Sequence, residues 1–214
     1  MNIAILGGTG REGAGLGARW AQAGHTIIIG SRDEERARAK AVELRERTGR
    51  LTIIGHDNAE AARLGEVVVV ALPAAGLATT LPGLRDGCRG KVVVSTVVAL
   101  DFRGRRLFVP PTIGSSAEET QALLPAARVV AAFQHIAAHE LAETDQSIDC
   151  DLLLCGDDSE AKQTVSALGE SMRLRAIDAG PLSNACALEG ITALLATINR
   201  RYKRHNAGIR ITGL

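Results

Sequence analysis

The stretch from Ile3 to Gly13 constrains the fold more than any other part of the chain. An apolar run, Ile3 to Leu6, ends in glycines and passes directly into a helical pattern, which predicts a strand, a tight turn and a helix. The glycines have the spacing G-x-G-x-x-G, in which the first permits the turn, the second admits a pyrophosphate and the third lets the helix pack on the strand. The alternative is a structural turn that only allows close packing. We predict dinucleotide binding by Gly8, Thr9, Gly10, Arg11, Glu12 and Gly13.

Apolar runs and helical patterns alternate along most of the chain, which predicts an α/β, doubly wound (Rossmann) fold with a mostly parallel sheet covered on both faces. The continuous run at 67–72 is typical of a buried parallel strand. Strands are expected at 3–6, 25–30, 51–54, 67–72, 91–95, 128–133, 151–155 and 174–178. Helices are expected at 12–23, 31–47, 59–64, 75–84, 116–124, 159–172 and 183–204, and a long loop at 101–116. The sheet should end at 178–181, which divides the chain into a dinucleotide-binding domain, 1–180, and a helical segment, 181–214.

The end of the second predicted strand indicates which dinucleotide is bound. An NAD site usually has an acidic residue there, whereas this chain has Gly30-Ser31-Arg32. Ser31 and Arg32 offer a hydroxyl and a cation to a 2′-phosphate, and Arg36 lies one helical turn beyond Arg32. These residues therefore predict NADP(H). The alternative makes Ser31 the N-cap of the next helix in a capping box, with the two arginines paired to acidic neighbours, the box partner being Glu34 and the ion-pair partners Asp33 and Glu35.

Composition excludes several other classes of function. The 25 Lys and Arg residues nearly balance the 24 Asp and Glu residues, so no strong field attracts nucleic acid or anionic membrane. Aromatic residues, at 2%, are too few for a base-stacking platform. The four cysteines form no C-x-x-C pair, and no apolar run reaches the roughly 18 residues of a membrane span. A cytoplasmic protein with small-molecule partners, and with neither nucleic acid nor membrane, is expected.

Four blocks of sequence together resemble one family over essentially the full length. They are Gly7-Gly8-Thr9-Gly10, Gly30-Ser31-Arg32, Cys155-Gly156-Asp157-Asp158 and Asp178-Ala179-Gly180-Pro181-Leu182-Ser183-Asn184. In order and spacing they are similar to the NADPH-dependent F420 reductases, also called F420:NADP oxidoreductases. Coenzyme F420 is an 8-hydroxy-5-deazaflavin. The resemblance implies hydride transfer between nicotinamide C4 and deazaflavin C5, with NADP(H) and F420 as cofactors, and a homodimer.

The resemblance also implies positions for both ligands. The segment Thr9 to Glu12 would contact the pyrophosphate, and residues 181–214 would close the deazaflavin pocket. Further positions implied for the ligands are Pro73, Ala74, Val98 and Ala137 on the nicotinamide side, and Asn206, Ala207 and Gly208 at the deazaflavin. Two departures fall on the substrate side. Gln134 replaces a histidine common in the family, with His135 following it, and Gly190 replaces a hydroxyl residue, although Thr192 is retained.

Direct hydride transfer between two stacked rings needs alignment more than an acid or a base. Candidate catalytic residues are therefore only His135, which could meet charge on the deazaflavin, and Thr192. For Thr192 the alternative is a bond to its own helix backbone. His135 and His139 have H-x-x-x-H spacing, which on a helix could bind a metal, but no metal site is predicted because the pair directly follows a strand. Asp157-Asp158 is interpreted as a turn and helix cap.

Two basic clusters are candidates for holding the acidic tail of F420. One is Arg200, Arg201, Lys203 and Arg204, and the other is Arg103, Arg105 and Arg106. The alternative for the first is a solvated helix end whose cations favour the helix dipole. Two other functions stay open on the sequence: an NADPH-dependent reductase of another acceptor, such as a flavin, a metal chelate or an imine, and a non-enzymatic NADP-binding redox sensor.

Overall fold

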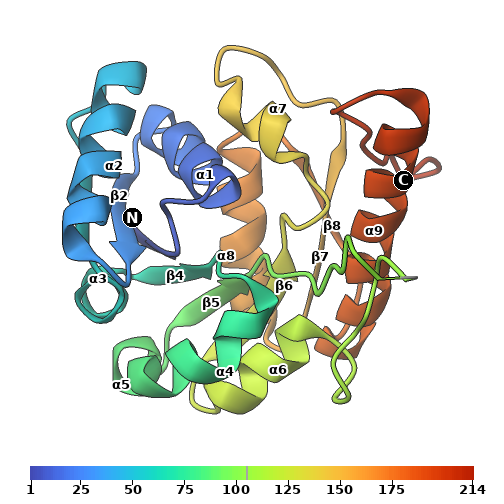
Figure 1. The fold of residues 1–214 in the computed structure, drawn as a ribbon, viewed down its shortest axis with the longest axis horizontal. Coiled ribbons are helices and arrows are strands. Elements are labelled where there is room, and N and C mark those ends of the chain that lie inside the picture. The colour runs from blue at the N-terminus through green and yellow to red at the C-terminus, as the bar shows by residue number, and fades with distance from the viewer. Residues whose placement is uncertain (105) are drawn as a thin grey trace.

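The computed structural model describes residues 1–104 and 106–214. Its elements confirm the predicted alternation of strands and helices (Figure 1). In chain order they are β1 (Asn2–Leu6), α1 (Arg11–Gln22), β2 (Thr26–Ser31), α2 (Glu34–Thr48), β3 (Ile53–Asp57), α3 (Asn58–Leu64), β4 (Val67–Val70), η1 (Ala74–Gly76), α4 (Leu77–Thr80), η2 (Leu81–Leu84), α5 (Arg85–Cys88), β5 (Val92–Ser95), α6 (Ser116–Leu123), β6 (Arg128–Ala132), α7 (Ala138–Ala142), β7 (Asp151–Gly156), α8 (Ser159–Glu170), β8 (Arg175–Asp178), η3 (Leu182–Asn184) and α9 (Ala185–Tyr202).

The strands of the described residues form one eight-stranded sheet in the order β3-β2-β1-β4-β5-β6-β7-β8. All neighbours are parallel except β6 and β7, so the prediction of a mostly parallel doubly wound sheet is confirmed. The connection from β6 to β7 packs α7 against α1 and returns to the sheet edge at which β6 ended. β7 therefore runs in the opposite direction, and β8 follows β7.

Each face of the sheet carries its own apolar core. In β1, Ile3 and Ile5 belong to the core under α1, α2 and α8, whereas Ala4 and Leu6 belong to the core under α3, α4, α6 and α9. This alternation follows from the two-residue period of a strand covered on both sides. Figure 1 shows α1, α2 and α8 on one side of the strands, and α4, α5 and α6 on the other.

Several predicted elements have other bounds in the structure: the helix expected at 31–47 begins at Glu34, and the strand expected at 67–72 ends at Val70. The single helix expected at 75–84 is instead a series of short turns, η1 to α5, because Pro82 has no N–H to donate and glycines interrupt the segment. The strand expected at 51–54 is β3, which runs later, Ile53–Asp57. β3 includes Gly55, a weak strand former, because a Cβ there would lie 2.4 Å from the backbone of Ala37 in α2.

The C-terminal segment packs against the rest of the fold. The sheet ends at Asp178 as predicted, and α9 contacts α6 and β7. Beyond α9, the Ile209 carbonyl accepts a hydrogen bond from Asp151 N at 2.8 Å, and Asp151 Oδ2 accepts one from Ile211 N at 2.6 Å. No helix within residues 1–104 and 106–214 is long and apolar enough to cross a bilayer.

Candidate functional site

The turn between β1 and α1 has the form that the glycine pattern predicts, but the roles that the pattern assigns fall partly on other glycines. The residue with positive φ is Gly7, at 72°, rather than Gly8, so the turn depends on Gly7. A Cβ at Gly8 would lie 2.8 Å from the Ile5 carbonyl oxygen, and Gly8 therefore packs beneath the turn. A Cβ at Gly13 would lie 2.9 Å from Gly8 Cα, which confirms that the third glycine allows helix and strand to meet.

Gly10 is the glycine that leaves space for a ligand. It is the N-cap of α1, and a Cβ there would meet only the Gly7 carbonyl oxygen, at 3.5 Å. Because glycine has no side chain that could cap the helix, the first N–H groups of α1 are left for an anion. A cavity of about 590 Å³ opens at this point, lined by Thr9, Gly10, Arg11, Glu12 and Gly13 among other residues.

The end of β2 brings three of the predicted phosphate ligands to the same cavity. Ser31, Arg32 and Arg36 all line it. Ser31 is not the N-cap of α2, as the alternative required: Asp33 is, and its Oδ1 accepts from Arg36 N at 3.2 Å. The Ser31 hydroxyl accepts from Asp33 N at 3.2 Å, because α2 begins two residues later than a capping box at Ser31 would need.

The ion pairs of α2 leave Arg32 and Arg36 unneutralised. Glu34 and Glu35 both pair with Arg38, at 2.7 and 3.0 Å, instead of with the two arginines at the cavity. Within residues 1–104 and 106–214, neither Arg32 nor Arg36 forms an ion pair. Two exposed guanidinium groups therefore stand at one end of the cavity, which is the charge that a 2′-phosphate needs.

Asn58 is a cavity residue that the sequence analysis missed. It begins α3, lines the cavity and accepts a hydrogen bond from Gly7 N through Oδ1 at 3.3 Å. The contact joins residues 51 positions apart and holds the glycine turn against β2 and β3. The local sequence signals only a helix start at this position.

A second, more apolar cavity of about 490 Å³ adjoins the first at Pro73. Pro73 lines both cavities, and Ala74, Val98, Phe102 and Val109 line the second. Three of the four residues expected beside the nicotinamide, Pro73, Ala74 and Val98, thus lie together where β4 and β5 end. Ala137, Thr192, Ala207 and Gly208 line neither of these two cavities.

His135 is buried and bonds to the backbone of β7. Just after β6 the chain turns away at Phe133, whose φ is 71°, and β7 extends beyond its partner strand. His135 Nε2 lies 3.0 Å from the Asp151 carbonyl oxygen and 3.3 Å from Leu153 N, in the place that β6 has left. A neutral ring makes one of these two bonds at a time. Burial lowers the pKa of His135, so the imidazole is neutral.

The other residues singled out from the sequence lie as follows. His135 precedes α7 and His139 is on it, so the two histidines do not share a helix face as metal ligation would require. The ring of His139 meets that of His205 edge-on, with ring centroids 6.0 Å apart. The Thr192 hydroxyl donates to the Leu188 carbonyl at 3.4 Å. Asp158 caps α8, as predicted. Asp157 instead accepts from Leu182 N at 2.9 Å, a contact between distant residues that a local turn does not predict.

The structure also places the four cysteines and the two basic clusters that the sequence analysis named. All four cysteines are free, and burial raises the pKa of Cys88, Cys150 and Cys155 to about 11, which keeps these thiols protonated. The basic residues at the end of α9, namely Arg200, Arg201, Lys203 and Arg204, are exposed and form no ion pair in the part of the chain that the structure describes. Arg105 of the second basic cluster lies outside the described residues.

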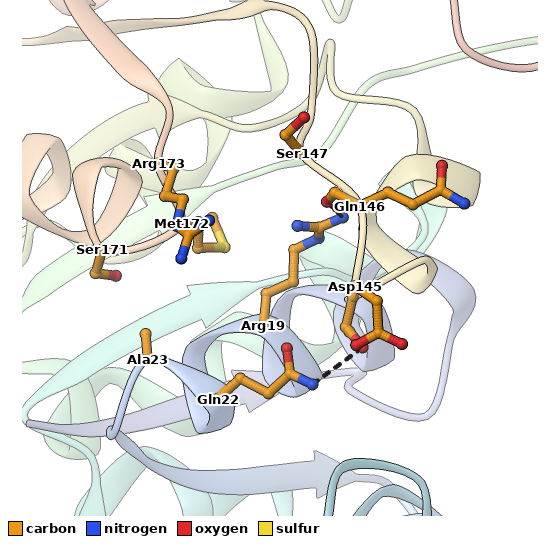
Figure 2. A pocket seen from close by; sticks show the side chains of 10 residues that line it. Arg19, Gln22, Ala23, Asp145, Gln146, Ser147, Ser171, Met172 and Arg173 are labelled. Carbon is orange, nitrogen blue, oxygen red and sulfur yellow. Dashed lines mark hydrogen bonds between the residues drawn. The ribbon is translucent and has the colours of Figure 1, made fainter.

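A cavity of about 390 Å³ away from the glycine turn is explained by packing (Figure 2). Arg19 enters it from α1 and donates to the carbonyls of Glu140, Leu141, Glu143 and Gln146, at the end of α7. Gln22 Nε2 donates to Thr144 Oγ1 at 3.1 Å. These bonds fasten the β6–β7 connection to α1, which positions the residues after β6 at the sheet edge.

Comparisons with known proteins agree with this geometry. The family model described as "NADP oxidoreductase coenzyme F420-dependent" matches residues 2–99. The F420-dependent NADP reductase of Methanocaldococcus jannaschii is 42% identical over 223 residues, covering 100% of this chain and 99% of that protein. The protein of the same name from Methanothermobacter thermautotrophicus is 40% identical, covering 100% and 96%. A solved candidate F420-dependent NADP reductase from Arthrobacter sp. FB24 is 25% identical, with a TM-score of 0.85 over 99% of both chains.

Proposed function

The chain belongs to the F420-dependent NADP reductase family, and we propose that it transfers a hydride between NADPH and coenzyme F420 across its two adjoining cavities. The observation that carries the choice of dinucleotide is the pair of unneutralised guanidinium groups, Arg32 and Arg36, at one end of the glycine-turn cavity. The same place in an NAD site would hold an acidic residue.

The residues present fit an extended dinucleotide. Gly10 leaves space where a Cβ would collide with a pyrophosphate, and the uncapped start of α1 offers N–H groups to it. With the 2′-phosphate at Arg32 and Arg36 beyond β2, the nicotinamide would lie on the opposite side of β1, over β4 and β5. Pro73 stands there, at the junction of the two cavities.

The second cavity has the character that a deazaflavin ring needs. Pro73, Ala74, Val98, Phe102 and Val109 offer an apolar surface to a flat heterocycle. When bound, the two cofactors supply the hydride chemistry themselves, from nicotinamide C4 to deazaflavin C5 or the reverse. The task of these residues is to hold two rings face to face and to exclude water. No acid or base is required, which agrees with the buried, backbone-bonded position of His135.

The homodimer and the cytoplasmic location expected from the resemblance are part of this proposal, as is the closing of the deazaflavin pocket by residues 181–214. Exposed apolar side chains on α9 and on the loop after β5, Leu194, Tyr202 and Phe102, supply contact surface for a second copy. Light scattering after gel filtration would measure the mass in solution, and a monomer at micromolar concentration would exclude the dimer.

An anaerobic mixing experiment tests the function. The purified protein is mixed with F420 and either NADPH or NADH while the visible absorbance of the deazaflavin is followed. Rapid loss of absorbance with NADPH and little with NADH is expected. If NADPH binds but no F420 is reduced, the F420 assignment is wrong, and flavin, metal-chelate and imine acceptors are tested next. If no acceptor is reduced, the redox sensor is favoured.

A further inference from the structure

We propose that Glu12 faces the nicotinamide half of the dinucleotide cavity and that its protonation state sets the relative affinity of the protein for NADP⁺ and NADPH. Glu12 is the second residue of α1 and lines the cavity. Its Oε1 is buried and has no hydrogen-bond partner among the described residues. The inference rests on the proposed function in one respect, namely that the ligand is NADP(H).

The strand order places Glu12 on the nicotinamide side. Its carboxyl meets the side chain of Thr96, which follows β5. Arg32 and Arg36 follow β2, and β2 and β5 lie on opposite sides of β1 in the sheet. A dinucleotide with its 2′-phosphate at the arginines and its pyrophosphate at the start of α1 therefore extends its nicotinamide toward Glu12.

Burial favours the protonated form of the Glu12 carboxyl more strongly than the neighbouring Thr96 opposes it. The Thr96 hydroxyl donates to the Val70 carbonyl at 3.2 Å. Because its only proton is directed at Val70, this hydroxyl stabilises an ionised Glu12 only weakly. Burial raises the pKa of Glu12 to about 8, an effect that Thr96 only partly offsets. At neutral pH, Glu12 is a neutral donor.

Among the described residues, no charged side chain contributes to the pKa shift of this carboxyl. The elements around it carry titratable groups that do not contribute to its pKa shift, namely Arg11 on α1, Arg32 and Arg36 across the cavity, and His135 and His139 after β6. β4 and β5 present only uncharged residues where they end, such as Ala71 and Ser95. The charge on a bound nicotinamide is therefore the strongest electrostatic influence on Glu12.

The two redox forms of the cofactor differ in that charge. The oxidised nicotinamide ring is positive and the reduced ring is neutral, whereas their phosphates are the same. Ionised Glu12 attracts the oxidised ring, and protonated Glu12 does not distinguish the two by charge. The ratio of the Kd for NADPH to the Kd for NADP⁺ should therefore rise as the pH passes through about 8. By linkage, binding of NADP⁺ near that pH should release a proton.

Calorimetric titration of the full-length protein with NADP⁺ and NADPH, between about pH 7 and about pH 9.5, tests the inference. The variants are Glu12→Gln, which keeps the shape and cannot ionise, and Glu46→Gln, a control at an exposed position on α2. In the wild type and the control, the Kd ratio should rise about tenfold. In Glu12→Gln the ratio should stay at its value near pH 7. Phosphate titration affects both ligands and cancels in the ratio.

Buffers with different ionisation enthalpies add a second measurement. Near pH 8 the wild type should release a proton on binding NADP⁺ but not NADPH, and Glu12→Gln should release none. A flat ratio in the wild type, or an unchanged rise in Glu12→Gln, would overturn the role of Glu12 while leaving the proposed function intact. Failure of the wild type to bind either dinucleotide would overturn the proposed function and this inference together.

Discussion

Glu189 in α9 accepts a hydrogen bond from the backbone N–H of Ser116, 73 positions earlier, at 3.1 Å. Its second oxygen accepts from Ala117 N, also at 3.1 Å. The fully buried carboxyl thus satisfies two free N–H groups at the start of α6 and fastens the C-terminal helix to the sheet domain.

Replacing Glu189 should lower the stability of the protein. Glu189→Ala leaves two buried N–H groups without partners and should lower the free energy of unfolding by about 1–3 kcal/mol, measured by urea denaturation. Glu189→Gln keeps one acceptor and should lose less. Equal losses in both variants would mean that the hydrogen bonds contribute little.

Glu189 should also impose a pH dependence on stability. Burial raises the pKa of Glu189 to about 7, against 4.5 for an unperturbed Glu. Because the folded state prefers the protonated form, this group's contribution is largest below pH 4.5 and is lost as the pH rises through about 7. The difference in stability between wild type and Glu189→Gln, measured at several pH values, should follow this curve and would be flat if the shift were absent.

His135 should act in the opposite direction. Burial lowers the pKa of His135, so acid protonates the unfolded chain first and stability should fall as the pH drops below about 6.5. His135→Gln can still bond to the Asp151 carbonyl and Leu153 N–H and should remove that loss. His135→Ala should be less stable at every pH. A large fall in hydride transfer in a stably folded His135→Gln would instead indicate a catalytic role.

Two glycines of the turn should separate binding from folding. Gly10→Ala places a Cβ in ordinary van der Waals contact with the Gly7 carbonyl oxygen, at 3.5 Å, and at an ordinary φ of −74°. The protein should therefore fold normally while its affinity for NADPH falls about tenfold or more. Gly13→Ala places a Cβ 2.9 Å from Gly8 Cα and should cost about 1–3 kcal/mol of stability. Thermal melts and fluorescence titrations measure the two effects. Unchanged NADPH affinity in Gly10→Ala would mean that the pyrophosphate lies elsewhere.

Arg32 and Arg36 should discriminate between the dinucleotides. Arg32→Ala and Arg36→Ala should each weaken NADPH binding about tenfold and leave weak NADH binding unchanged, because only NADPH carries the 2′-phosphate. Arg38→Ala is the matched control, since Arg38 lies on the same helix but pairs with Glu34 and Glu35. Equal losses for NADPH and NADH would contradict a phosphate site.

The basic end of α9 gives a test of F420 recognition. Combined Arg200→Glu and Arg204→Glu should weaken binding of F420, whose tail is acidic, in a salt-dependent way and leave NADPH affinity unchanged. Arg89→Glu, at an exposed arginine paired with Asp86, is the control. Unchanged F420 affinity would favour a solvated helix end.

The sequence patterns that predict the dinucleotide half of the site are local, and the structure brings most of the residues they name to one cavity. The turn at residues 7–13 and the arginines one helical turn apart lie in short windows, where strand and helix periods place side chains directly. The same windows could not show that Asp33 rather than Ser31 caps α2, or that Gly7 rather than Gly8 adopts the positive φ. Several residues fit either role, and the packing of β1 against β2 decides between them.

By itself, the sequence determined the alternation of strands and helices, the glycine turn and the type of nucleotide. Only the tertiary structure decided that β7 runs antiparallel to β6 and that His135 bonds to the backbone of β7 where β6 no longer pairs with it. It also decided that Asn58 holds the glycine turn and that Glu189 caps α6. Each of these depends on contacts between residues far apart in the chain, 51 positions for Asn58 and 73 for Glu189. The packing of the elements determines which distant polar groups meet, and the local spacing of apolar residues does not predict these contacts.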